Sequence, residues 1–223
     1  VVVSEYHLFP YSLLSAAKEG LIQAEPTDWL GTARYDNPGT HVHDSGKVAP
    51  GVTLLASYWK SPDWKPGIRL INSSGETLHF WKINPRDIWP ESPHSDYKAG
   101  GLNVWWNSIQ GLHLFANGDV LFHINYMSMV RMNAKGEVLW KLPYRTHHCL
   151  NPDSSGNFWV CGLKWLENNP EGRKRLEKYP GLKPPVAEEF AVKVSAEGEV
   201  LREISLLDAL YDSEYEHLLW QQR

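Results

Sequence analysis

The amino-acid sequence predicts an all-β fold made of repeated antiparallel hairpins, and two observations carry this prediction. Three stretches share one pattern, in which an alternating strand with Arg or Lys leads through a polar Gly-Glu turn into a second alternating strand. The stretches are residues 68–83, 129–142 and 191–204. Their turn glycines, Gly75, Gly136 and Gly198, are 61 and 62 residues apart. The second observation is composition, since 11 Trp, 10 Tyr, 17 Gly and 15 Pro favour short strands joined by turns.

A further pair of strands precedes each of these hairpins. The second strands of those pairs are residues 51–58, 118–125 and 156–163, and each begins with glycine. Every unit therefore has four strands, which is the repeat of a β-propeller blade. Because about three blades do not close a ring, we expect this chain to carry part of a larger propeller.

The remaining segments are assigned in chain order. Apolar residues at helical spacing predict an N-terminal helix from about Tyr11 to Gln23, and Pro, Gly, Asp and Asn make residues 25–50 mostly loop. We therefore divide the chain into a helix and linker, residues 1–42, and a partial β-propeller, residues 43–223. The third unit contains a polar insertion at 164–189 with one short helical piece. Such an insertion is either a lid or contact surface, or neutral decoration.

Composition excludes several classes of protein. With 22 basic and 26 acidic residues and no run of Lys or Arg, we expect no nucleic-acid partner. Two cysteines do not make a disulfide framework, and no window is long and apolar enough to span a membrane. The chain begins with three valines rather than Met, which predicts that a segment precedes residue 1. The sequence leaves the oligomeric state open, a homo-oligomer included.

Candidate site residues emerge when the three units are aligned on their strand-opening glycines. Eight residues before Gly51, Gly118 and Gly156 stand His43, Gln110 and His148. In a propeller this position lies near the start of the innermost strand, where successive blades converge on the channel mouth. We expect the three side chains either to surround one small polar ligand or to be exposed and hydrated. His113, five residues before Gly118, is a weaker candidate.

The neighbours of His148 suggest the chemistry of such a ligand. His147, His148 and Arg145 are suited to an oxyanion, because imidazolium and guanidinium groups donate charge-assisted hydrogen bonds. Neutral imidazole is also a nucleophile or general base near neutral pH. The sequence has no convincing metal-ligand spacing, no glycine-rich phosphate loop and no serine nucleophile elbow.

The two cysteines flank the turn of the same hairpin. A turn at residues 153–156 places Cys149 and Cys161 close to opposite each other on paired strands. Two alternatives follow: a cross-strand disulfide in an oxidising compartment, or two small buried thiols.

Several of these stretches together resemble the bacterial arylsulfotransferase family. They are "GLHLFANGDVLF" (111–122), "MVRMNAKGEVLWKLPYRTHH" (129–148), "DSSGNFWVCG" (153–162), and "APGVTLLASYW" followed by "IRLINSSGETLHFW". The resemblance covers residues 43–208 and implies a propeller of about six four-stranded blades. It also implies transfer of a sulfuryl group from an aryl sulfate ester to a phenol through a histidine intermediate, with no adenylyl-sulfate cofactor. Family members work in the periplasm or otherwise outside the cytoplasm, often with an N-terminal anchor or signal sequence.

The resemblance assigns roles to some residues and not to others. His148 matches a family histidine that precedes a Gly-Asn turn, and His147 and Arg145 match its neighbours. The previous unit has Gln110 where the family often has His. The family histidine that takes up the sulfuryl group lies in a later blade, and no segment before Arg223 matches it.

Those departures keep a second hypothesis open, in which the chain is a non-catalytic β-propeller that binds a small anion or a protein partner. The 164–189 insertion is then the contact surface. A quinoprotein-type oxidoreductase has little support, because metal carboxylates and adjacent cysteines are missing from the sequence.

Overall fold

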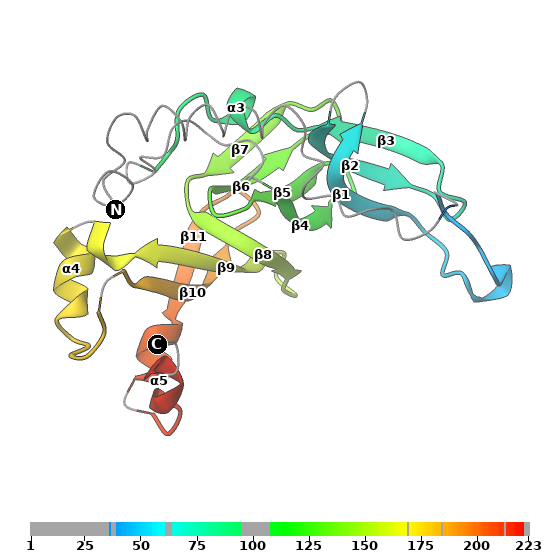
Figure 1. Ribbon diagram of the computed structural model, residues 1–223. Helices are drawn as coiled ribbons and strands as arrows, with labels where there is room; N and C mark the ends of the chain where they lie inside the picture. The colour runs from blue at the N-terminus through cyan, green and yellow to red at the C-terminus, as the bar shows by residue number, and fades with distance from the viewer. Residues whose placement is uncertain are drawn as a thin grey trace. The chain divides into compact units, whose positions relative to one another are not determined.

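The computed structural model describes residues 36, 39–60, 64–94, 108–168, 170–183, 185–211 and 213–220. Most of their regular secondary structure is β-strand (Figure 1). They form two compact units. The first contains the described residues up to 91 and Ser108, and the second contains residues 92–94 and the described residues from 109 onward. The helix predicted from Tyr11 to Gln23 lies outside the described residues.

The first unit is a three-stranded antiparallel sheet. Its strands are β1 (Thr53–Lys60), β2 (Trp64–Ile71) and β3 (Thr77–Lys82), in the order β1-β2-β3. Two short helices flank it: η2 (Ser45–Lys47), capped by the Asp44 side chain, and α3 (Pro85–Ile88), capped by Asn84. The prediction of an innermost strand near His43 is wrong, because residues 39–52 contain only bends, irregular chain and the short helix η2.

The second unit contains two four-stranded antiparallel sheets. One sheet runs β4 (Ile109–Leu114), β5 (Val120–Ile124), β6 (Ser128–Met132) and β7 (Val138–Leu142) in that order. The other runs β8 (Arg145–Pro152), β9 (Phe158–Trp165), β10 (Ala187–Val194) and β11 (Val200–Ser205). In both, consecutive strands pair (Figure 1), which confirms the predicted four-stranded units for these two repeats.

The repeated Gly-Glu turns have one backbone geometry. Gly75, Gly136 and Gly198 have φ values of 86°, 84° and 90°, a left-handed conformation that only glycine adopts without strain. In each turn the glycine N–H donates to the carbonyl three residues earlier, at 3.0–3.1 Å. The regular spacing of these glycines in the sequence therefore corresponds to a structural repeat.

The two sheets of the second unit share a core, and one of the contacts between them is made by a turn. Their common core consists of Leu121, Met129, Leu150, Phe158, Val160, Phe190, Val192 and Val194. At its edge the carbonyl of Ala196 accepts hydrogen bonds from Arg131 Nη1 at 3.1 Å and Trp140 Nε1 at 3.0 Å. Since Ala196 belongs to the β10–β11 turn, these bonds tie β6 and β7 to the neighbouring sheet.

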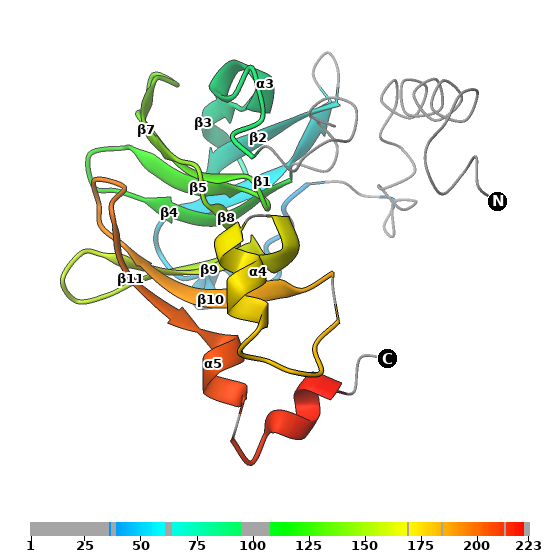
Figure 2. The same cartoon turned by 90° about the vertical axis from the view of Figure 1, so that its left-hand side faces the viewer.

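The insertion of the third repeat packs onto its own sheet. It contains η3 (Leu166–Asn168) and α4 (Pro170–Leu176), and β10 resumes with Ala187 opposite Trp165. After β11 come α5 (Leu206–Leu210) and η4 (Glu216–Trp220). Figure 2 shows α4 and α5 at the same end of the sheet, where Leu166, Tyr179 and Leu207 form a small core. The segment thus has a structural role, and its predicted role as a lid or contact surface stays a prediction.

Candidate functional site

The candidate site is built on two irregular strands of the second unit. In β8, His147 pairs with Cys161 and Leu150 pairs with Val160, so His148 and Cys149 form a bulge with no cross-strand partner. In β4, Gln110 pairs with His123 and His113 pairs with Leu121, so Gly111 and Leu112 lie opposite the single residue Phe122. This bulge therefore has one extra residue, whereas the bulge in β8 has two. Bulges redirect side chains and often occur next to active sites.

The pairing changes how the two repeats align. The partner of Gln110, His123, lies five residues after Gly118, and the partner of His147, Cys161, lies five residues after Gly156. Gln110 is therefore equivalent to His147, because the bulge in β8 is one residue longer. Counting back eight residues from each glycine pairs Gln110 with His148 instead, and this alignment is wrong by one residue.

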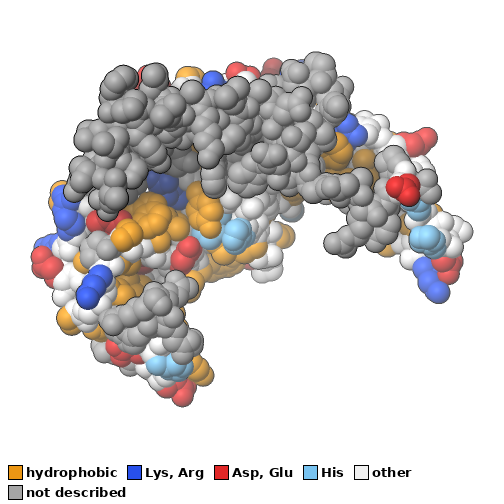
Figure 3. Space-filling view, viewed as in Figure 1, with side chains coloured by type: hydrophobic (Ala, Val, Ile, Leu, Met, Phe, Trp, Pro, Cys, Tyr) orange, Lys and Arg blue, Asp and Glu red, His pale blue; other side chains and the backbone are white. Residues whose placement is uncertain are grey.

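The side chains of Gln110 and His148 nevertheless meet. Gln110 Oε1 lies 2.9 Å from the backbone N of His148 and 2.9 Å from its Nδ1. Because a backbone N–H only donates, the amide oxygen faces His148, and the imidazole must then carry its proton on Nδ1. In the neutral ring the lone pair is consequently on Nε2. His148 is exposed, and Figure 3 shows histidine side chains on the surface over β8, beside hydrophobic and acidic side chains.

The backbone at His148 is in an uncommon conformation. Its φ of 59° is left-handed, as is the φ of 52° at Gly111 in the other bulge. Non-glycine residues adopt this region rarely, at a cost of about 1–3 kcal/mol, and such residues cluster at functional sites. The surrounding contacts hold His148 in a conformation that its own sequence does not favour.

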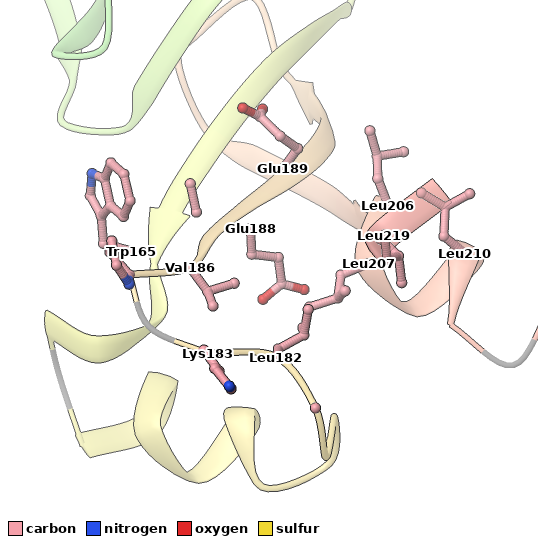
Figure 4. Close-up of a pocket in the computed structure, with 13 residues that line it drawn as sticks. Trp165, Leu182, Lys183, Val186, Glu188, Glu189, Leu206, Leu207, Leu210 and Leu219 are labelled. Carbon is pink, nitrogen blue, oxygen red and sulfur yellow. The ribbon is translucent and has the colours of Figure 1, made fainter. Parts of the chain in front are cut away.

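His147 is buried beside the exposed histidine. Its Nε2 lies 2.9 Å from Glu189 Oε2 on β10, and its Nδ1 is buried with no hydrogen-bond partner among the described residues. Burial lowers the pKa of His147, and this outweighs Glu189, which raises it. Figure 4 shows Glu189 pointing away from Glu188, to the opposite side of β10. A neutral His147 with both nitrogens enclosed is suited to positioning the bulge rather than to attacking a substrate.

His123 stabilises the β8 bulge through a hydrogen bond to its backbone. It is fully buried, its Nε2 lies 3.1 Å from the Cys149 carbonyl, and burial lowers its pKa to about 4. The neutral ring therefore donates its Nε2 proton to this carbonyl. A Cβ at Gly111 would lie 2.5 Å from His123 Cδ2, so the glycine leaves the space that the ring occupies.

Tyr126 lies at the edge of the site, on the turn between β5 and β6. Its ring centroid is 4.6 Å from that of His147 and 6.2 Å from that of His148. Its N–H donates to the Thr146 carbonyl, and its own carbonyl accepts from Arg145 Nη1 at 3.4 Å. Arg145 is buried and holds this turn, and its predicted contact with a sulfate stays a prediction.

The two other predicted residues lie elsewhere. His113 packs edge-on against Phe115 and Phe158 at 4.8 and 5.0 Å, and burial together with Arg131 lowers its pKa. It is half-buried and packs beside the core of the second unit. His43 is exposed, in a bend of the first unit. The predicted residues that the structure brings together are thus His148, His147, Gln110 and Arg145.

Three residues of the site were missed by sequence reasoning: His123, Tyr126 and Glu189. Glu189 is part of an alternating strand, and the sequence does not indicate which strand faces it. Tyr126 directly follows the predicted strand 118–125, so the sequence could have indicated that it lies on a turn at the end of that strand.

The same bulge carries the two thiols. Both cysteines are free, Cys149 is exposed and Cys161 half-buried, and their Sγ atoms are 3.4 Å apart. The strands thus place them next to each other as predicted, although Cys149 is not a buried apolar residue. Among the described residues no group of three or more His, Cys, Asp or Glu is arranged to hold a metal ion. No described helix is long and apolar enough to cross a membrane.

Comparisons with known proteins identify no relative. No protein-family model matches the sequence, and a search of curated proteins finds no match either.

Proposed function

We propose that this chain forms part of a β-propeller enzyme that transfers a sulfuryl group from an aryl sulfate ester to a phenol, with His148 as the carrier. Support for the propeller comes from three successive antiparallel sheets, two of which share a core and a turn contact. Support for the activity comes from the resemblance of residues 43–208 to arylsulfotransferases. An extracytoplasmic or periplasmic location, with an anchor upstream of residue 1, belongs to the same proposal.

The observation that carries the proposal is the hydrogen bond between His148 and Gln110. It places the proton of the neutral imidazole on Nδ1, and the nucleophilic lone pair on Nε2 of an exposed ring. An activated nucleophile needs a second group that orients it, and Gln110 is that group. The later-blade histidine that the family uses is then not required for a first transfer.

The reaction balances with a single histidine. The Nε2 lone pair attacks sulfur, the bond from sulfur to the aryl oxygen breaks, and its electron pair leaves on the phenolate. In the product the imidazole ring carries a positive charge and the SO₃ group keeps its negative charge. The Nδ1–H bond to Gln110 strengthens as the ring charge develops. In the second step a phenol oxygen attacks sulfur, the N–S electron pair returns to Nε2, and the phenol proton passes to solvent.

The neighbouring residues have positioning roles in this scheme. Glu189 and His147 fix the start of the bulge, and His123 fixes the Cys149 carbonyl at its end. The exposed Tyr126 ring offers an aromatic surface for the aryl group. Arg145 remains a candidate for the sulfate oxygens, whereas the packing of His113 favours a structural role.

The test is release of nitrophenol from 4-nitrophenyl sulfate in the presence of a phenol acceptor. We expect His148→Ala to lower kcat by about a thousandfold, the scale of losing a central reacting group. His217→Ala, an exposed histidine on η4, is the matched control and should leave the rate unchanged. Gln110→Leu should lower kcat/KM by about 10–100-fold, and Gln110→Glu, which keeps an acceptor, should restore part of it. An unaltered rate in His148→Ala would remove this residue from the reaction.

A second candidate is the non-catalytic β-propeller that binds a small anion or a protein partner. One observation favours it, because Gln110 occupies the place where the family often has histidine. Folded protein that turns over no aryl sulfate with any phenol, but binds sulfate with an affinity that His148→Ala weakens, would support this alternative.

A further inference from the structure

The thiols of Cys149 and Cys161 face each other across the bulge that carries His148. Their Sγ atoms are 3.4 Å apart, which is contact distance for two sulfur atoms that are not bonded. We propose that this pair is a redox modification site, at which a small disulfide such as oxidised glutathione converts the two thiols into an intramolecular disulfide. This inference goes beyond the proposed function and does not depend on it.

The folded chain holds both sulfur atoms in place before oxidation. Cys161 lies in the central strand β9, where it pairs with Ala191 on one side and His147 on the other. Cys149 is fixed through its carbonyl, which accepts the Nε2 proton of His123. Because the residue before Cys149 is also held, by Gln110, little backbone freedom is left to lose when the sulfur atoms join. Ordered thiols at contact distance have a high effective concentration for each other.

Access and burial set the order of the two steps. The exposed Cys149 thiolate attacks one sulfur of glutathione disulfide, forms a mixed disulfide and releases one glutathione thiolate. The sulfur of Cys161 then attacks the Cys149 sulfur, loses its proton to solvent and releases the second glutathione. Two protein thiols are oxidised, and one glutathione disulfide is reduced to two thiols. Burial raises the pKa of Cys161 to about 11, which agrees with its role as the second, resolving thiol.

The product encloses residues 149–161, the segment that forms the β8–β9 hairpin. Its cross-link would fix the end of the bulge covalently, where the reduced protein relies on the hydrogen bond from His123. The position of Cys149, one residue after His148, places the modification directly beside the proposed reacting group.

The test is to equilibrate the reduced, folded full chain with excess glutathione disulfide, and then to quench with acid and measure the intact mass. We expect the major species to lose two hydrogen atoms and to resist alkylation by iodoacetamide, with a cross-linked 149–161 peptide after digestion. Single variants separate the steps. Cys161→Ser should accumulate the glutathione adduct on Cys149, whereas Cys149→Ser should react more slowly, because Cys161 is half-buried.

Three outcomes would overturn the proposal. In the first, both thiols of the folded chain remain open to alkylation after equilibration. In the second, each cysteine ends as a separate glutathione adduct. In the third, the cross-link forms no more completely in the folded chain than in the chain unfolded in urea, which would mean that the fold does not preorganise the pair. Serine at an exposed or half-buried site is compatible with folding, and circular dichroism of both variants checks this.

Discussion

At the scale of single residues, the site depends on a histidine in a conformation that histidine rarely adopts. His148 has a left-handed backbone, and its ring and N–H both bond to one oxygen of Gln110. The strain is offset by contacts from β4, β5 and β10, none of which is adjacent in sequence to His148. This arrangement gives the exposed ring a defined tautomer, and the defined tautomer is the chemical basis of the proposed transfer.

The buried His123 predicts a measurable pH dependence of stability. The folded chain keeps it neutral down to about pH 4, whereas the unfolded chain protonates it near its ordinary pKa of 6.5. Unfolding therefore takes up a proton between these values, so the contribution is complete above pH 6.5 and is lost as the pH falls toward 4. Between pH 6.5 and pH 4, protonation of this group in the unfolded chain should lower the free energy of unfolding by up to roughly 3 kcal/mol.

Urea unfolding at stepped pH values checks this, with His123→Gln as the comparison because Gln keeps an N–H donor for the Cys149 carbonyl. The variant should show a shallower pH dependence than the parent. Part of the slope should remain, since burial also lowers the pKa of His147. Identical slopes in the two proteins would show that His123 does not stay neutral on folding.

At the scale of elements, an ion pair with a fully buried carboxylate helps to attach the insertion to the sheet of β8–β11. Arg175 on α4 donates to both carboxylate oxygens of Glu188, whose side chain is fully buried. Ser205 donates to the same carboxylate, and Asp208 on α5 accepts from Arg175. The helices at this end of the sheet are thus linked to β10 by one charged network.

Removing the arginine should destabilise the protein strongly. Arg175→Met leaves the Glu188 carboxylate buried without its cation, which we expect to cost about 3–5 kcal/mol in urea unfolding. Lys164→Met is the matched control, since it breaks an exposed pair with Glu203 on the same sheet and should cost less than about 1 kcal/mol. Similar losses in both variants would contradict the structural role given to the buried pair.

At the scale of the whole second unit, two equivalent turn glycines report how the sheets fit together. Gly136 and Gly198 have nearly the same φ, but a Cβ at Gly136 meets nothing within 4 Å, whereas one at Gly198 would lie 2.8 Å from the Trp140 ring. Gly136→Ala should cost about 1–2 kcal/mol for the left-handed backbone alone. Gly198→Ala should cost about 1–3 kcal/mol more, because it overpacks the contact between the sheets. Equal losses in thermal or urea unfolding would show that the turn does not pack on Trp140 in solution.

The sequence predicted the features of this unit that are local in the chain. Strand alternation and the Gly-Glu turns are encoded within about 15 residues, so the repeat, the strand-opening glycines and the neighbouring cysteines could be read directly. The bulges could not, because they arise from pairing between strands and shift one alignment by a residue. The contact of His147 with Glu189 depends on the pairing of β9 with β10, which are separated by a 21-residue insertion between Trp165 and Ala187. No local sequence pattern indicates which strand pairs with β9 after such an insertion.

The most direct measurement for the central claim is to find where the sulfuryl group is held. The full chain is incubated with 4-nitrophenyl sulfate without an acceptor, digested near neutral pH and analysed by peptide mass spectrometry. The proposal predicts one added SO₃ on His148, its removal when a phenol is supplied, and no adduct in His148→Ala. An adduct on another residue in the parent chain, or full turnover by His148→Ala, would contradict it.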